Sequence, residues 1–522
     1  MRNAIGNAII GLLIITTGLS SCQKGDLLSN PNVAAENSTV PVSLIFNHIA
    51  ANTLREEEPV ISTVYRYNQN IVSNYSYYFG TNTYNWSNTN QTYDIIRYCN
   101  KLDEQVQKQY ADAPSVYRGL SKFYRAYAFI WLTQRVGDIP MSQAGDENNL
   151  TPAYDSQHDV YKNCLALLDT ANSILSTLPP TATVNGDIYG LTNLQWRKVI
   201  NSYKLRILIS LSKRAEDNAD LNIKQQFAAI VSDADTYPIM SSNADNLAYK
   251  YTAITLYPPN RSGNAPYNNC ENISKTFFDI TAAYGEPRVF ALTIPAQEQI
   301  TAGKQAGDFT AYVGEDNAKS QGLMSNFSAD GKYSNLSYTR YMSSPSGANA
   351  EPYIILGYPE MCFNIAEAAY RGWLTDESAA DWYNKGIDAS MNVYGLTQGQ
   401  ILTIKSVDGT VTFGTATADI NSFKANANVA YNDAEGLTQI LTQKYVAFFM
   451  NSGYESYYNW RRTGIPAFSQ GDVGIGTANN MIPLRWQYPQ DEITYNNANY
   501  SSAISSQYGG TDDVNAKMWL IK

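Results

Sequence analysis

The sequence predicts a mainly α-helical protein with a helical first half, a loop-rich second half and little β-structure. Three observations carry this prediction. Apolar residues recur at helical spacing in long segments of the first half, Gly, Asn, Ser, Pro and Tyr dominate residues 237–352, and only two short segments resemble strands. Long helices joined in pairs by short breaks favour stacked helical hairpins of a degenerate tetratricopeptide-like kind.

The helix predicted over residues 115–136 shows the pattern best. Val116, Leu120, Phe123 and Tyr127 line one face, and Gly137 follows the last apolar position. Glycine is common just past the end of a helix, so the pattern and its stop signal agree. By the same reasoning we expect further helices in this half over 42–58, 91–110, 161–178, 196–215 and 223–235.

The second half differs from the first in its composition and contains fewer helical patterns. Between residues 237 and 352 only 272–284 follows a helical pattern, and helices resume over 354–373, 376–394 and 437–451. Segments 401–404 and 410–413 flank an Asp408-Gly409 turn and predict one small hairpin. The tail, 464–522, is predicted to be rich in loops. We therefore divide the chain into a helical half, 42–236, and a loop-rich half, 237–522, intertwined as one domain.

The N-terminus indicates secretion and lipidation. Arg2 precedes a short apolar segment, residues 8–15, which is too short to span a bilayer and has the layout of a signal peptide, 1–21. Leu19-Ser20-Ser21-Cys22 follows and is typical of a lipobox, in which the Cys22 sulfur takes the lipid. Residues 22–41 would then be a tether, held durably because several acyl chains share one anchor. The alternative is a plain signal peptide with a chance cysteine.

Charge and cysteine content exclude several function classes. The net charge is −10, and without Lys/Arg runs this argues against nucleic acid and anionic lipid surfaces as partners. No cysteine pair has metal-binding spacing, and we expect neither a metal site nor a cofactor. Most of the remaining thiols are expected to be free and buried: Cys99, Cys164, Cys270 and Cys362.

Catalytic motifs are equally sparse, and we predict no catalytic residue. His48 and His158 are the only histidines and lie far apart, which gives little support to a histidine-based triad. Glu360 and Glu367 lie seven residues apart on one predicted helix and could form a glycosidase-like carboxylate pair. The interpretation we favour is that they hold the fold and that Arg461 or Arg462 pairs with them.

Aromatic residues supply the candidate ligand site. The chain has 40 Tyr against 16 Phe, and a tyrosine offers both an apolar ring and a hydroxyl, which suits a sugar. Polar side chains beside such rings could bond to hydroxyl groups. The candidates are Tyr78, Tyr84 and Trp86, with Tyr75 and Tyr77 beside them, and in the loop-rich half Tyr257, Asn260, Arg261, Asn264, Tyr267, Tyr333, Tyr338 and Tyr341.

Several short motifs, in this order and spacing, also resemble a known family. They are Gly137-Asp138-Ile139-Pro140, Asn264-Ala265-Pro266-Tyr267, Glu286-Pro287-Arg288, Tyr358-Pro359-Glu360, Ala366-Glu367-Ala368, Trp460-Arg461-Arg462-Thr463-Gly464 and Ile482-Pro483-Leu484-Arg485. Together with the lipobox they resemble the SusD/RagB lipoproteins, in the SusD-like group of degenerate sequence. The family usually has Asn-Pro-Tyr and Asp-Pro-Arg where this chain has Asn264–Tyr267 and Glu286–Arg288.

The resemblance implies a function and a partner. It implies a lipid-anchored, surface-exposed protein of the bacterial outer membrane that is not an enzyme. Such a protein binds an oligosaccharide or another small nutrient and delivers it to a SusC-like TonB-dependent transporter. Two alternatives remain open at this point: a glycan-degrading lipoprotein with paired carboxylates, and a helical-repeat scaffold that binds no ligand.

Overall fold

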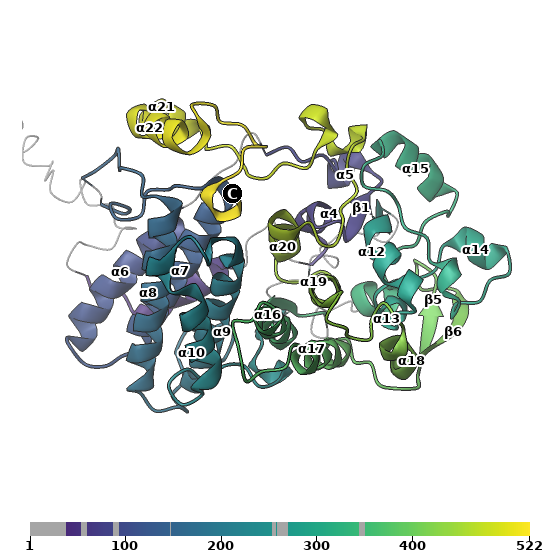
Figure 1. The fold of residues 1–522 in the computed structure, drawn as a ribbon, viewed down its shortest axis with the longest axis horizontal. Coiled ribbons are helices and arrows are strands. Elements are labelled where there is room, and N and C mark those ends of the chain that lie inside the picture. The colour runs from purple at the N-terminus through teal and green to yellow at the C-terminus, as the bar shows by residue number, and fades with distance from the viewer. Residues whose placement is uncertain are drawn as a thin grey trace, which may run out of the picture.

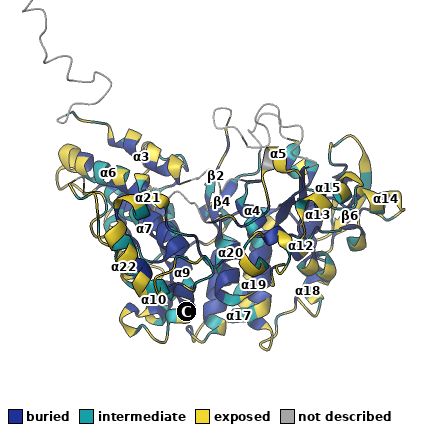
Figure 2. Ribbon diagram, turned by 90° about the horizontal axis from the view of Figure 1, so that it is seen from above, coloured by how far each residue is buried: buried dark blue, intermediate teal, exposed yellow. Residues whose placement is uncertain are grey.

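The computed structural model describes residues 38–53, 60–86, 93–146, 148–252, 257, 270–343 and 350–522. Long helices, stacked side by side, occupy one side of the molecule in Figure 1, and short helices with small strand pairs occupy the other. Figure 2 shows that buried residues run through both sides. The mainly α-helical class predicted from the sequence is confirmed.

The long helices stacked side by side form a helical array, and the first half of the chain contributes six of those described. They are α3 (Val42–Asn52), α6 (Asp94–Tyr110), α7 (Val116–Val136), α8 (Gln157–Ser176), α9 (Asn193–Ser210) and α10 (Ile223–Ser232). Each of α6 to α9 packs against the next along the chain, as expected for stacked hairpins. Two helices begin earlier than predicted because polar residues cap them: the side chains of Ser156 and Thr192 accept hydrogen bonds from the first turns of α8 and α9.

The array continues into the second half of the sequence. Its members there are α16 (Tyr358–Tyr370), α17 (Ala379–Val393), α19 (Gly436–Ala447) and α20 (Glu455–Thr463). Helix α16 packs against α9, α17 and α19, so the helical array crosses residue 236 (Figure 1). The division of the chain at that residue stays a prediction.

Three antiparallel strand pairs make up the described β-structure: β1 (Ile71–Ser73) with β3 (Glu271–Ile273), β2 (Leu247–Tyr249) with β4 (Tyr353–Leu356), and β5 (Gln400–Lys405) with β6 (Thr412–Ala418). The predicted hairpin around Asp408-Gly409 is confirmed as β5–β6. The starts of two predicted helices, at residues 272 and 354, were wrong. Those residues lie in β3 and β4, where short buried runs pair with distant strands and give no periodic signal.

The helix predicted over 272–284 is confirmed in part as α12 (Lys275–Ile280). Other short helices were missed: α13 (Arg288–Leu292), α14 (Gln297–Thr301) and α15 (Gln321–Ala329) in the segment before residue 352, α18 (Ile420–Ala425) after the hairpin, and α21 (Gln490–Tyr495) and α22 (Asn497–Tyr508) in the tail. Most are one or two turns long, which is too short for a periodic apolar pattern to be recognised. Tertiary contacts hold them: the Tyr508 hydroxyl, for example, donates to the Val136 carbonyl at the end of α7 at 2.6 Å.

Buried ion pairs join neighbouring helices, in one case across the two halves of the chain. Arg206 on α9 donates from Nε and Nη2 to the two carboxylate oxygens of Glu360 on α16, at 2.6 and 2.5 Å. Arg462 on α20 binds both oxygens of Glu367, with Nη2 2.8 Å from Oε2. Arg462 is therefore confirmed as a predicted partner, whereas Arg461 donates to backbone carbonyls. Both glutamates hold the fold, as we expected.

The thiols also match the expectation. Cys99, Cys164, Cys270 and Cys362 are all free and buried. Burial raises the pKa of the Cys99 thiol to about 12, so this group stays protonated and behaves as a small apolar side chain. Within the described ranges, no helix has both the length and the apolar character to cross a membrane.

Candidate functional site

Several predicted positions fall where the structure makes no statement. Cys22, Asn260, Arg261, Asn264 and Tyr267 lie outside the described residues. Tyr78 belongs to the backbone of α5 (Ser76–Phe79), but its side chain is also outside the description. Their roles stay predictions.

Two of the candidate rings are packed inside the protein. Tyr84 and Trp86 are each 3% exposed. Trp86 stacks on Trp486 with ring centroids 3.8 Å apart, and the Tyr84 hydroxyl donates to the Tyr67 carbonyl at 3.0 Å. These contacts join the segment after α5 to the C-terminal part of the chain. The two rings contribute core packing in this structure and present no face to solvent.

Three candidates of the loop-rich half also lie away from an open surface. Tyr257 and Tyr341 are buried, and burial raises the pKa of each hydroxyl well above its ordinary value. Tyr338 is half-buried and lies over the β5–β6 turn, where a side chain at Gly409 would collide with its ring. The sequence could not separate these rings from exposed ones, because tyrosine suits both a core and a wet surface.

The remaining candidates lie on one surface, which we call the α5/α15 surface. Tyr75 and Tyr77 at α5 are 42% and 80% exposed, with ring centroids 6.5 Å apart. Across from them, Phe327 on α15 and the half-buried Tyr333 have ring centroids 6.3 Å apart. Both ribbon views place α15 beside α5 (Figures 1 and 2). The structure thus brings together Tyr333 and the N-terminal tyrosines, which are about 250 positions apart in the sequence.

Hydrogen bonds of Asn74 connect the elements that carry the rings of this surface. Asn74 follows β1, and its backbone N–H donates to the Cys270 carbonyl at 3.0 Å. Its side-chain amide donates to Asn272 Oδ1 at 2.6 Å and to Ser328 Oγ at 2.7 Å, so it links β1, β3 and α15. The Ser325 hydroxyl donates to the Asn74 carbonyl. Because Tyr75 follows Asn74 and Phe327 precedes Ser328, these hydrogen bonds position the rings on both sides.

A charged layer lies beneath the α5/α15 surface. Arg66 pairs with the buried Glu271 of β3, Nη2 to Oε1 at 2.6 Å. Burial and the neighbouring Asp316 and Glu271 raise the pKa of the Glu315 carboxyl to about 8. Burial and this same Glu315 also raise the pKa of Tyr333. Glu315 is itself 1% exposed, so its carboxyl lies under the surface and offers no hydrogen bond to a ligand there.

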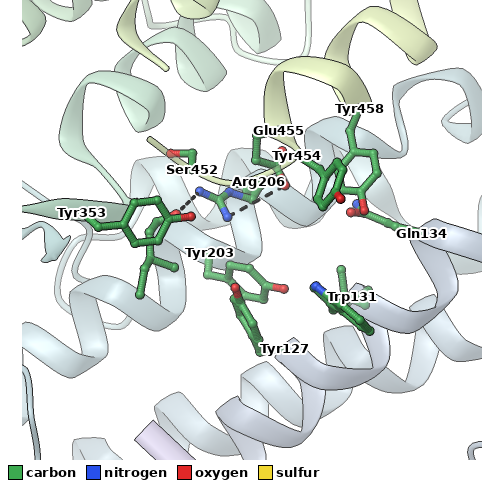
Figure 3. Close-up of a pocket in the computed structure, with 13 residues that line it drawn as sticks. Tyr127, Trp131, Gln134, Tyr203, Arg206, Tyr353, Ser452, Tyr454, Glu455 and Tyr458 are labelled. Atoms are coloured by element: carbon green, nitrogen blue, oxygen red, sulfur yellow. Dashed lines mark hydrogen bonds and ion pairs between the residues drawn. The ribbon is translucent and has the colours of Figure 1, made fainter. Parts of the chain in front are cut away.

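A second set of rings surrounds a small central cavity between α7, α9, β4 and α20 (Figure 3). Its aromatic lining is Tyr127, Trp131, Tyr203, Tyr353, Tyr454 and Tyr458. Arg206 and Glu455 lie among these rings, 3.9 Å apart from Nη1 to Oε1. The enclosed volume, about 30 Å³, has room for one or two waters but not for a sugar ring. We regard this cavity as part of the packing between the two halves.

The groups considered above for catalysis are held in other interactions or lie apart. Among the described side chains, no three His, Cys, Asp or Glu groups come together in a way that could hold a metal ion. The carboxylates considered for glycosidase chemistry, Glu360 and Glu367, are 2% and 0% exposed and bind arginines. What the α5/α15 surface offers is aromatic faces with hydrogen-bonding groups beside them, which is the composition of a binding surface.

Fold and surface together define a class: an α-helical scaffold with exposed aromatic rings on the side of its short helices. The chain belongs to the SusD-like family, described as starch-binding and associating with the outer membrane, whose model matches residues 31–489. No curated protein matches the chain in sequence.

Comparison with solved structures also shows similarity to SusD-like proteins. A SusD homolog from Bacteroides fragilis NCTC 9343 is 29% identical, with a TM-score of 0.79 over 92% of this chain and 100% of that one. An outer-membrane protein of Bacteroides vulgatus ATCC 8482, described as involved in nutrient binding, is 28% identical, with a TM-score of 0.76 over 92% and 100%. A chitin-binding protein shares the fold at 23% identity, with a TM-score of 0.66 over 92% and 99%.

Proposed function

We propose that this protein captures oligosaccharides at the cell surface through the α5/α15 surface and delivers them to a SusC-like TonB-dependent transporter. Nutrient binding is the property of the family; the oligosaccharide, the site and the transporter are our proposal. The observation that carries the site is the exposure of Tyr75 and Tyr77 beside Phe327 and Tyr333. A ring with one free face can cover the C–H face of a sugar while neighbouring polar groups bind its hydroxyls.

Lipid anchoring at Cys22 is part of the same proposal. The first described residues run along α6: the Val40 N–H donates to Gln105 Oε1 at 3.0 Å, and Gln109 Nε2 donates to the Val40 carbonyl at 2.8 Å. The tether would therefore leave the fold at α6. We propose that this helical side docks on the transporter, since stacked helix pairs give broad, rigid faces, and that the loop-rich side contacts the ligand.

The experiment compares binding of maltoheptaose and chitohexaose by calorimetry. The first follows the starch-binding description of the family, and the second follows the chitin-binding protein that shares the fold. Each lost ring contributes about 1 kcal/mol, so Tyr75→Ala with Tyr77→Ala should weaken binding by more than tenfold. Tyr495→Ala is the matched control, because this ring is 73% exposed on α21, away from the surface.

The results separate the alternatives. Equal affinity of the double variant and the wild type would move the ligand site away from the α5/α15 surface. Hydrolysis of either oligosaccharide by the wild type would favour the glycan-degrading alternative. If the wild type binds neither probe nor any glycan on an array, the scaffold alternative takes precedence.

A further inference from the structure

A groove that the capture proposal does not use lies on another side of the loop-rich half. It runs between η5 (Ala282–Tyr284), η6 (Phe309–Ala311) and α18, and we call it the α18 groove. Its volume is about 340 Å³, within the range of small-molecule sites and more than ten times that of the central cavity. Figures 1 and 2 both place α18 apart from α5.

The groove has aromatic walls that are held in place. Tyr284 and Phe309 are half-buried, and Phe423 of α18 is buried behind them. Phe309 stacks on Phe290 of α13, with ring centroids 4.5 Å apart and an angle of 24° between the planes. A ring already held by stacking on one face loses little conformational entropy when a ligand covers its other face. The entropic cost of binding is therefore smaller.

The polar wall of the groove is equally fixed. Asp419 Oδ1 accepts from the Ser422 N–H at 3.1 Å and from Gln398 Nε2 at 3.1 Å, and Oδ2 accepts from the Ser422 hydroxyl at 2.6 Å. These hydrogen bonds hold the pKa of Asp419 below its ordinary value, so the carboxylate is charged at neutral pH. Asn426 Nδ2 donates to the Tyr284 carbonyl at 3.0 Å and connects the polar wall to the aromatic one.

A charged carboxylate retains acceptor positions after three such bonds, because its two oxygens offer about four. Ser422 and Asn426 add further acceptors. A ligand rich in hydroxyl donors and with an apolar C–H face satisfies both walls at once. An anionic ligand would meet Asp419 without a cation among the residues that line the groove, and a purely apolar ligand would leave the polar wall without hydrogen bonds.

We propose that the α18 groove is a second sugar subsite, with Tyr284 and Phe309 as the ring contacts and Asp419 as the acceptor for sugar hydroxyls. The proposal rests on the proposed function and extends it to a second contact on the same protein. A short oligosaccharide would occupy the two sites independently. A polysaccharide long enough to reach both would bind with avidity, because the second contact forms at high effective concentration.

The test uses the full mature protein with maltoheptaose and chitohexaose in calorimetry. The wild type should bind two equivalents of at least one probe. Tyr284→Ala should weaken one of these sites by about fivefold, the effect of about 1 kcal/mol for one ring, and Tyr75→Ala with Tyr77→Ala should weaken the other by more than tenfold. Asp419→Asn is the second groove variant; it keeps the side-chain shape and the cap of α18, and it should weaken the same site as Tyr284→Ala. Tyr495→Ala again serves as the control for losing an exposed ring.

The possible outcomes distinguish failure of the second subsite from failure of the capture function. A stoichiometry of one, unchanged by Tyr284→Ala and Asp419→Asn but abolished by the double tyrosine variant, would overturn the second subsite and leave the capture function standing. Loss of one equivalent in both groove variants supports the subsite. Failure of the wild type to bind any probe would remove the capture function first and the subsite with it. Circular dichroism of each variant shows whether the fold is intact, and Asp419→Asn decides the matter if Tyr284→Ala does not fold.

Discussion

Replacing Glu367 with Gln should destabilise the protein markedly, because it removes the anion between two arginines. The Glu367 side chain is fully buried, and besides Arg462 it binds Arg371, whose Nη2 lies 2.8 Å from Oε1. Gln keeps the size of the side chain but leaves the Arg462 charge, 6% exposed, without its counter-ion. Removing one partner of a buried pair typically costs about 3–5 kcal/mol of unfolding free energy.

The pH dependence gives a second measure of the same interaction. Arg462 and Arg371 lower the pKa of Glu367 from its ordinary 4.5 to about 2, although burial alone would raise it. That difference corresponds to about 3 kcal/mol of stability. Because the folded pKa is the lower one, this contribution is complete above about pH 5 and disappears as the pH falls toward 2. Glu367→Gln has no such carboxyl and should lose less stability over that interval.

The assay is denaturant unfolding of wild type and variant at pH 7, followed by thermal midpoints at intervals between pH 5 and 2. Lys275→Ala is the control, because the Lys275–Asp279 pair is exposed and its loss should cost less than about 1 kcal/mol. A Glu367→Gln variant that unfolds at the wild-type midpoint, or that follows the wild-type acid curve, would refute the reasoning. Replacing Glu367 and Arg462 together by Met should cost less than Glu367→Gln alone, since the buried Arg462 charge is removed with its partner and the remaining Arg371 is 26% exposed to water.

The remaining predictions concern the anchor, the partner and the backbone. Cys22→Ala should move the protein from membranes to the soluble fraction, and absence of a clickable palmitate label on the wild type would contradict lipidation. In-cell crosslinking and mild detergent extraction should co-purify a TonB-dependent barrel; recovery of the protein alone would contradict delivery to a transporter. Gly314→Ala should destabilise by about 1–3 kcal/mol, since its Cβ would come 2.5 Å from the Lys275 backbone, whereas Gly322→Ala on α15 meets nothing within 4 Å and should be neutral or mildly stabilising. Equal thermal midpoints for the two glycine variants would show that the backbone can relax at Gly314.

Helices with a continuous apolar face could be predicted from the sequence, because their buried residues recur at helical spacing along the chain. Residues 115–136 contain α7 almost end to end. Prediction failed where a segment's structure depends on a distant partner. Glu271–Ile273 pairs with Ile71–Ser73 across about 200 positions, and no local pattern can report such pairing.

For the candidate site too, local sequence signals could be recognised, whereas contacts between distant segments could not. Composition identified tyrosine as the residue of interest, and order along the chain pointed to the segment of Tyr75 and Tyr77 and to Tyr333. Burial then separated the exposed rings from Tyr84 and Trp86, which contact each other, and Trp86 stacks on Trp486 some 400 positions later. Asn74 could not have been found from sequence, because its role depends on Asn272 and Ser328 lying beside it.

The C-terminal residues close on helices that are formed from the first half of the chain. The Lys213 ammonium donates to the Ile521 carbonyl at 3.1 Å, and the Leu520 N–H donates to Gln157 Oε1 at 2.9 Å. Closing a loop of this size, 308 positions between Lys213 and Ile521, costs about 5 kcal/mol of chain entropy before any contact compensates for it. Such contacts should form late, after the last segment of the chain is available. Until then α8 and the end of α9 would expose apolar surface, and such surface favours aggregation of the incomplete chain.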